Sequence, residues 1–140
     1  MKELTLLAQS ENMNLVLDFV NEILEKHNCP MYVQLELDIA VEELFVNIAH
    51  YAYTPNIGQA TIQVSVKNDY VTIVFRDRGI PYNPWAKKDP DITLSLEERQ
   101  IGGLGIYMVK NSMDEVAYTY EDEMNVVTIK KNISEKNKEK

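Results

Sequence analysis

The stretch ELFVNIAHYAY, residues 43–53, decides the fold class and also raises the question of function. Residues four apart lie one above the other on a helix, so Glu43 and Asn47 share one polar stripe. A carboxylate can accept a proton, and an amide oxygen is a hard ligand suited to Mg²⁺. Polar residues beside an apolar stripe are equally the ordinary pattern of a solvated helix face. Apolar spacing predicts a helix from Tyr32 to Tyr53, with a buried stripe of Leu37, Val41, Leu44, Ile48 and Ala52.

Working outward, the flanking sequence alternates between strand-like and helical periodicity. Residues 3–8 predict a strand, and Ser10 or Asn12 is placed to cap the helix that follows. Pro30 ends that helix, because proline disfavours helical backbone in the residue before it. The expected buried residues of this first helix are Leu15, Phe19, Ile23 and Leu24.

Two strand pairs are expected in the rest of the chain. Residues 60–66 and 70–75 are strand-like, and the tight turn Asn68-Asp69 joins them into an antiparallel hairpin. Residues 116–120 and 126–130 form a second hairpin after a helix that ends at Met113. Residues 76–100 keep no sustained period and predict a loop.

The order strand, two helices, hairpin, loop, helix, hairpin predicts an α/β two-layer sandwich. Its helices cover one face of a mixed, mostly antiparallel sheet. We expect one domain over residues 1–131 and a polar, disordered tail over residues 132–140.

Composition limits the function. The net charge of −8 repels phosphate backbones, which argues against nucleic acid as a partner. No apolar run approaches the roughly 18 residues of a membrane span, so no membrane partner is expected. The single cysteine, Cys29, permits no internal disulfide, and the N-terminus lacks a signal pattern. These features predict a cytoplasmic protein.

Two more stretches contain residues that could bind a ligand. DRGIPYNPW, residues 77–85, follows a strand, so its carboxylate could accept a hydrogen bond from an exocyclic amine. The same letters also describe an ordinary Asp-X-Gly turn. Gly102, Gly103 and Gly105 open a helix, where backbone N–H groups and the dipole favour an anion. A flexible hinge is the other interpretation, and the spacing matches neither a Walker P-loop nor a Rossmann fingerprint.

In this order the three stretches resemble the N, G1 and G2 boxes of the GHKL ATP-binding superfamily, which has the Bergerat fold. The chain is similar, over roughly residues 3–131, to the anti-sigma factor serine/threonine kinases of the RsbW/SpoIIAB type. DRGIPYNPW and GGLGIYMVKNSMDEV, residues 102–116, are the most specific parts of the resemblance.

The resemblance implies ATP and Mg²⁺ as cofactors, and a role for each matching residue. Asn47 would hold Mg²⁺ against the ATP phosphates, and Glu43 would be the general base. Asp77 would bind the adenine amino group, with Gly79 beneath the ring. Gly102, Gly103 and Gly105 would border the phosphates.

The segment from Pro84 to Gly102 would be the ATP lid, and its Arg99 would stabilise charge at the γ-phosphate. Phosphoryl transfer depends on positioning and charge neutralisation more than on covalent chemistry. The implied partners are an anti-anti-sigma protein of the STAS type, a sigma factor and a second copy of the chain in a homodimer.

Two positions depart from the family pattern. Tyr51 stands where relatives often have histidine, and Asn83 replaces an aspartate. His50, one residue before Tyr51, is expected to be a partly buried, hydrogen-bonded histidine without a catalytic role. These departures keep a second hypothesis open, in which the protein is a non-catalytic nucleotide-binding module that sequesters its partner.

Overall fold

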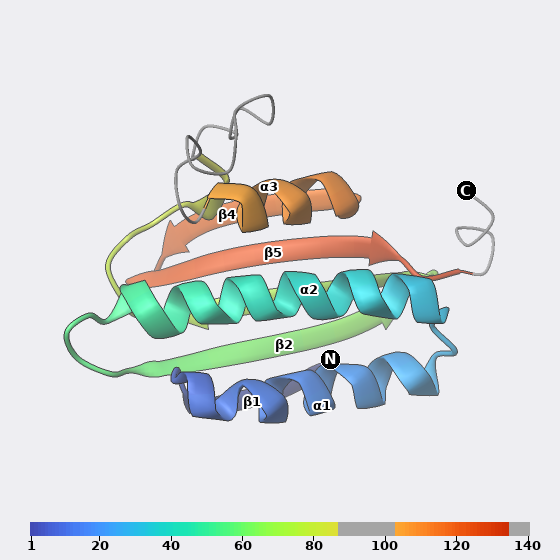
Figure 1. Cartoon of the computed structure of the whole chain (residues 1–140), viewed down its shortest axis with the longest axis horizontal. Coiled ribbons are helices and arrows are strands. Elements are labelled where there is room, and N and C mark those ends of the chain that lie inside the picture. Colours follow the sequence, from blue (N-terminus) through green and yellow to red (C-terminus); the bar gives the residue numbers. More distant parts are fainter. Residues whose placement is uncertain (87–102, 135–140) are drawn as a thin grey trace.

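The computed structural model describes residues 1–86 and 103–134. Five strands form one sheet in the order β1-β2-β3-β5-β4, and every pairing in this part of the chain is antiparallel. In this part of the chain three α-helices lie on one face of the sheet, with α2 between α1 and α3 (Figure 1). The prediction of a two-layer α/β sandwich with a mostly antiparallel sheet is confirmed. The strands are β1 (Lys2–Leu7), β2 (Gln59–Lys67), β3 (Tyr70–Asp77), β4 (Glu115–Glu121) and β5 (Met124–Asn132).

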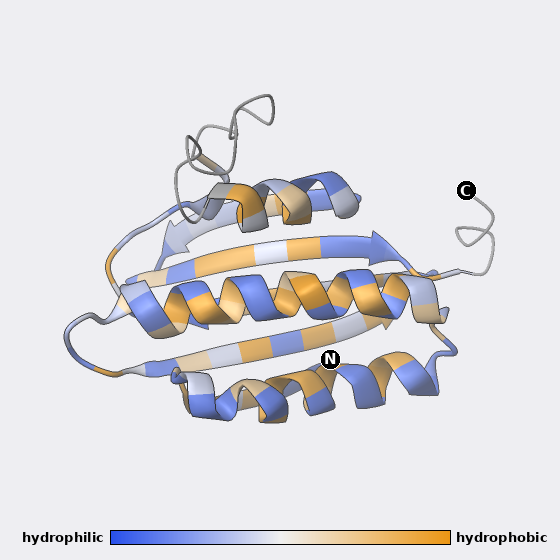
Figure 2. Cartoon of the chain, viewed as in Figure 1, coloured by the Kyte–Doolittle hydropathy of each residue, from blue (hydrophilic) through white to orange (hydrophobic). Residues whose placement is uncertain are grey.

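Both predicted hairpins form, and each has a two-residue turn. Asn68 and Asp69 connect β2 to β3, with φ of 53° and 64°. Asp122 and Glu123 connect β4 to β5, with φ of 54° and 62°. Left-handed backbone at both turn residues matches the right-handed twist of the paired strands. Alternating apolar and polar residues along β2 put one side of the strand against the helices (Figure 2).

The core lies between the sheet and the inner faces of the helices. Phe45 of α2 (Met31–Asn47) and Phe75 of β3 are fully buried and are its largest side chains. Burying a side chain of this size contributes about 1.5–3 kcal/mol to folding. The predicted stripe of α2 is confirmed at Leu37, Val41, Leu44 and Ile48, which are buried, and Ala52 packs against them.

The long predicted helix changes type before its end. The α-helical part stops at Asn47, and residues Ile48–Ala52 form one π-helical segment, η2. Such segments are rare and recur at functional sites. The apolar period of the sequence is nearly the same for the two helix types over one turn, which is why the pattern did not separate them.

The buried face of α1 (Met13–Lys26) was predicted partly wrongly. Val16 and Val20 are buried together with Ile23 and Leu24, whereas Leu15 is 57% exposed. Both sets have helical spacing, and docking of α1 against α2 and β2 selects between them. The expected cap also differs. Ser10–Asn12 form a 3-10 turn, and the Asn12 amide donates to the carbonyl of Leu7 at 2.8 Å.

Helix α3 (Gly103–Ser112) begins at the predicted glycines. A short 3-10 turn, η3 (Pro84–Ala86), precedes the segment that lies outside the described residues. At the other end of the chain β5 includes Asn132, and Ile133 is buried with its N–H donating to the carbonyl of Asp69 at 2.8 Å. The expected tail from residue 132 therefore does not start before residue 134, and residues 135–140 lie outside the described part.

No helix in the described residues is long and apolar enough to cross a membrane.

Candidate functional site

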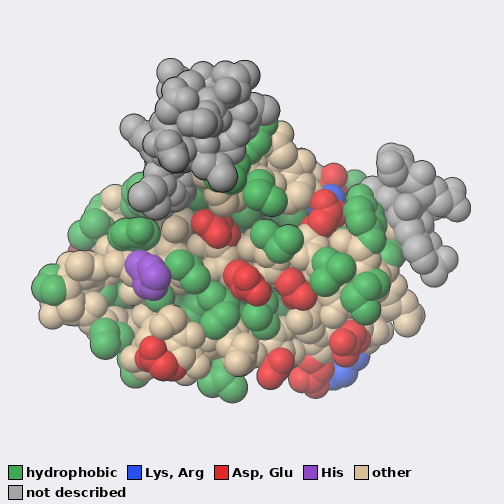
Figure 3. All heavy atoms as spheres, in the orientation of Figure 1, with side chains coloured by type: hydrophobic (Ala, Val, Ile, Leu, Met, Phe, Trp, Pro, Cys, Tyr) green, Lys and Arg blue, Asp and Glu red, His purple; other side chains and the backbone are tan. Residues whose placement is uncertain are grey.

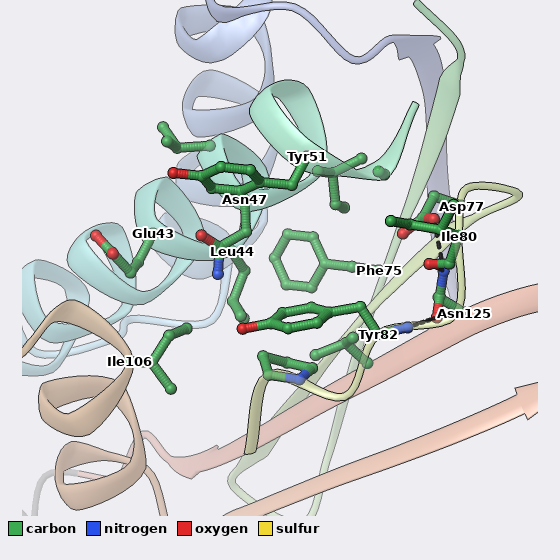
Figure 4. A pocket seen from close by; sticks show the side chains of 15 residues that line it. Glu43, Leu44, Asn47, Tyr51, Phe75, Asp77, Ile80, Tyr82, Ile106 and Asn125 are labelled. Atoms are coloured by element: carbon green, nitrogen blue, oxygen red, sulfur yellow. Dashed lines mark hydrogen bonds between the residues drawn. The ribbon is translucent and has the colours of Figure 1, made fainter. Parts of the chain in front are cut away.

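A cavity of about 530 Å³ opens between the C-terminal half of α2, the end of β3 and the start of α3 (Figure 4). Its walls are mostly apolar, and a few polar groups converge on it, which is the usual composition of a small-molecule site. The residues that line it are Glu43, Leu44, Val46, Asn47, Ile48, Tyr51, Ala52, Phe75, Asp77, Ile80, Tyr82, Pro84, Ile106, Asn125 and Val127.

Glu43 and Asn47 lie one helical turn apart on α2, and both line the cavity (Figure 4). The Glu43 carboxylate lies directly against the backbone of Gly105, in the first turns of α3. A Cβ on Gly105 would overlap both the carboxyl carbon and an oxygen of Glu43. The fold therefore brings together two residues that are distant in sequence, and glycine at position 105 leaves room for the carboxylate.

Asp77 occupies the opposite end of the cavity. It is the last residue of β3 and only 5% exposed. Its Oδ1 accepts hydrogen bonds at 2.9 Å from the Gly79 N–H and from the Asn125 amide. Burial raises the pKa of this carboxyl, and the two hydrogen bonds oppose that effect. Both bonds from described residues fall on Oδ1, so Oδ2 is available to a donor in the cavity.

Asn125 is the residue of this site that the sequence analysis missed. It faces Asp77 across the β3–β5 pairing and is 3% exposed. Its Nδ2 also donates to the carbonyl of Ile80 at 2.9 Å, while its Oδ1 accepts from the Tyr82 N–H at 3.0 Å and the Tyr118 hydroxyl at 2.5 Å. One amide thus fixes both the carboxylate and the loop after it. The sequence offered one indication of this role: Asn125 is a polar residue directly before the apolar residues of a predicted strand.

Gly79 has a packing role that the sequence did not indicate, and its predicted place beneath an adenine ring stays a prediction. A Cβ there would overlap the carbonyl and the Cβ of Ala52 in η2. The next residue, Ile80, donates its N–H to the same carbonyl at 2.9 Å. The missing side chain lets the loop after β3 pack against the π-helical segment, which fixes the wall of the cavity between Asp77 and Asn47.

The first turn of α3 faces the cavity through Ile106, which is buried and lines it. Backbone N–H groups at a helix start have no partners within the helix, and the dipole favours an anion beside them. Gly103 is the first residue of α3. Gly102, Arg99 and most of the predicted lid lie outside the described residues.

Three other sequence features have structural outcomes. His50 is exposed rather than partly buried, and its ring packs edge-on against Tyr51 with centroids 6.1 Å apart. It points outward because η2 turns its buried side, Ile48, toward the core. Tyr51 itself lines the cavity. The side-chain oxygen of Asn83 accepts from the Trp85 N–H at 2.9 Å, a bond that aspartate could also make.

The donors at the Glu43 end suit a magnesium ion that is shared with a ligand. Asn47 offers an amide oxygen, which is a hard donor of the kind Mg²⁺ takes. Among the described residues, no group of three or more His, Cys, Asp or Glu side chains could hold a metal by itself. Mg²⁺ typically keeps one or two protein ligands and completes its shell with water and phosphate oxygens, so this sparse set fits.

Residues 6–131 match the family of histidine kinase-like ATPase domains, and the chain belongs to this family. Curated relatives are described as serine-protein kinase RsbW. The protein of Bacillus mycoides (strain KBAB4) is 28% identical over 99 residues, and that of Bacillus cereus (strain ATCC 10987 / NRS 248) is 29% identical over 99 residues. Each match covers 68% of this chain and 62% of the relative, so the chain spans under two thirds of their length.

Proposed function

We propose that the cavity binds ATP, with the adenine at the Asp77 end and the phosphates at the α3 end. The observation that carries this proposal is the separation of the two polar sets by apolar walls. A buried carboxylate with one free oxygen suits an exocyclic amine at one end. Asn47 and the helix start at Gly103 and Gly105 suit phosphate and Mg²⁺ at the other. Gly102 would extend the phosphate-binding turn.

The proposed reaction is transfer of the γ-phosphoryl group to a serine or threonine hydroxyl. Glu43 would accept the hydroxyl proton while the oxygen attacks phosphorus and ADP leaves. Mg²⁺, held by Asn47, would neutralise phosphate charge, and Arg99 would add to that neutralisation at the γ-phosphate. The carboxylate of Glu43 lies against the first turns of α3, beside the proposed phosphate position, which supports its role as the base.

The substrate we propose is an anti-anti-sigma protein of the STAS type, and the output is control of transcription through sequestration of a sigma factor in the cytoplasm. The support is the family membership together with relatives described as serine-protein kinases. We further propose that residues 1–131 act as one domain and that the chain functions as a homodimer.

A second candidate function is nucleotide-gated sequestration without catalysis. Tyr51, which stands where relatives often have histidine, is the observation that favours it, because this side chain lines the cavity. In that case the cavity would still bind ATP, and the bound nucleotide would only control access of the partner.

The test is phosphotransfer from γ-labelled Mg-ATP in an extract of the host cells. Glu43→Ala is expected to lower labelling of a small protein about a hundredfold or more while ATP binding is retained. Glu42→Ala is the matched control, because Glu42 is the exposed neighbouring carboxylate on α2. Labelling that survives Glu43→Ala contradicts the role of Glu43 as the base. No labelling at all, with ATP binding measured in the same preparation, favours the non-catalytic module.

A further inference from the structure

Helix α2 has a second apolar stripe, on the side that faces away from the sheet. We define the α2 outer stripe as Tyr32, Leu35, Ile39 and Val46. Successive members are three, four and seven residues apart, so they line up along one side of the helix. Tyr32, Leu35 and Ile39 are 46%, 55% and 49% exposed, whereas Val46, at the end of the row, is half-buried and also lines the cavity.

This stripe is not needed by the core. At 100° per residue it lies opposite the side of α2 that carries Leu37, Val41 and Leu44, which are buried. Isolated apolar residues on a surface need no explanation, but an aligned row on a helix that also has a buried apolar side is unusual. Because α2 lies between α1 and α3, the row runs along the middle of the helical face (Figure 1). Contiguous exposed apolar side chains are a feature of protein association sites.

The charges around the α2 outer stripe are acidic. The exposed carboxylate of α2 beside this row is Glu42, and Figure 3 shows acidic side chains among the apolar ones on this face. The charge of Glu36 is compensated, because its Oε1 lies 3.5 Å from the ammonium of Lys131. On the neighbouring α1, the ammonium of Lys26 is 3.5 Å from a carboxylate oxygen of Glu22, so its charge is already compensated. The net charge of the whole chain is −8. Positive charge on a partner would therefore complement this face.

We propose that the α2 outer stripe binds an amphipathic helix of a partner protein whose apolar side is flanked by Lys and Arg. The apolar side would cover Leu35 and Ile39, and its basic flank would meet the exposed carboxylate of Glu42. Helix-against-helix recognition of this kind uses apolar anchors at three- and four-residue spacing. A second copy of the chain fits poorly, because a two-fold contact would bring the same acidic side chains together. The inference holds for a kinase and for a non-catalytic module alike.

The test uses a synthetic fluorescent peptide of about 18 residues, or about five helical turns, with leucines on one side and Lys and Arg on the other. Anisotropy measures its binding to the full chain. The double variant Leu35→Ser/Ile39→Ser is expected to bind about tenfold or more weakly. Ile57→Ser is the matched control, because Ile57 is also exposed (63%) but lies in the turn before β2. That variant is expected to bind like the unmodified chain.

Charge is tested separately. A peptide with the same leucines but Glu in place of Lys and Arg is expected not to bind. Glu42→Lys is expected to weaken the basic peptide without removing an apolar contact, which keeps the proposal testable if the double variant does not fold. Equal binding to the double variant, equal binding of the acidic peptide, or no binding of the basic peptide overturns the proposal. So does sedimentation that shows a dimer lost specifically in the double variant, because the occupant is then a second copy.

Discussion

The two ends of the cavity are built in opposite ways. At one end Asp77 and Asn125 are 5% and 3% exposed, and hydrogen bonds join them to each other and to the loop after β3. At the other end Glu43 and Asn47 are partly exposed, and neither side chain is hydrogen-bonded to another described residue. The Glu43 carboxylate packs against the backbone of Gly105 without a hydrogen bond to it.

This difference indicates which end of the cavity is preorganised for a ligand. The Asp77 end is held by hydrogen bonds before a ligand arrives, which suits the proposed recognition of one flat heterocycle over another. The Glu43 end leaves its oxygen atoms without side-chain partners among the described residues, which suits the proposed binding of a metal ion and transfer of a proton. Variants can be chosen to break one end and spare the other.

The largest effect is expected from Asn125→Ala. This change removes an acceptor from the Tyr118 hydroxyl and the Tyr82 N–H, and it leaves the buried Asp77 with one donor fewer. We expect the free energy of unfolding to fall by about 2–4 kcal/mol. Urea unfolding measures it. Asn14→Ala, on the exposed side of α1, is the control and is expected to change little. Equal stability of the two variants would mean that the network does not hold the loop.

Asp77→Asn is expected to weaken nucleotide binding by about 1.5–3 kcal/mol, because an amide NH₂ faces the adenine amine where a charged acceptor was. The free energy of unfolding of Asp77→Asn should instead increase relative to the parent at neutral pH. Burial raises the pKa of Asp77 in the folded protein above its usual 3.8. The protonated carboxyl therefore stabilises the fold at low pH, and this contribution to the free energy of unfolding is lost as the pH rises through the raised pKa. The variant should therefore gain stability over the parent above that pH and lose the gain below it.

Titration calorimetry measures the binding, and urea unfolding at a series of pH values measures the stability. Asp18→Asn on the exposed side of α1 serves as the control for a change of net charge alone. A stability difference between Asp77→Asn and the parent that is independent of pH would contradict the assignment of the raised pKa to this carboxyl.

The smallest effect is expected from Gly105→Ala. Alanine favours helix, so the fold should be kept, but its methyl group must displace the end of the Glu43 side chain. We expect phosphotransfer to fall about tenfold, or about 1.4 kcal/mol, with a smaller change in ATP affinity. Asn111→Ala, an exposed position of the same helix, is the control. Unchanged transfer in Gly105→Ala would show that the position of the Glu43 carboxylate is not critical.

The parts of the site on single elements were predictable from the sequence. Glu43 and Asn47 share a side of α2 because four residues make about one turn, which local geometry dictates. Asp77 at the end of β3 and the glycines at the start of α3 followed from strand and helix boundaries in the same way. Their roles were suggested by a resemblance over most of the chain, and those roles remain predictions until the variants are made.

The parts that involve two elements were not predictable. Asn125 faces Asp77 only because β5 inserts beside β3 in one register, and nothing local in either strand encodes that pairing. The close packing of Gly79 against Ala52 was likewise not predicted, because the two residues belong to different elements. Leu15 has the spacing of a core residue and is exposed, because the docking of α1 selected its neighbours Val16 and Val20.

The sequence by itself determined the main helices and strands, their order and the polar stripe of Glu43 and Asn47, since each depends on a period or a turn within a few residues. The tertiary structure decided which sides of the helices are buried, which loop meets η2 and which amide fixes Asp77. Those outcomes depend on contacts between residues that are tens of positions apart, where packing and strand register, rather than local preference, select one arrangement.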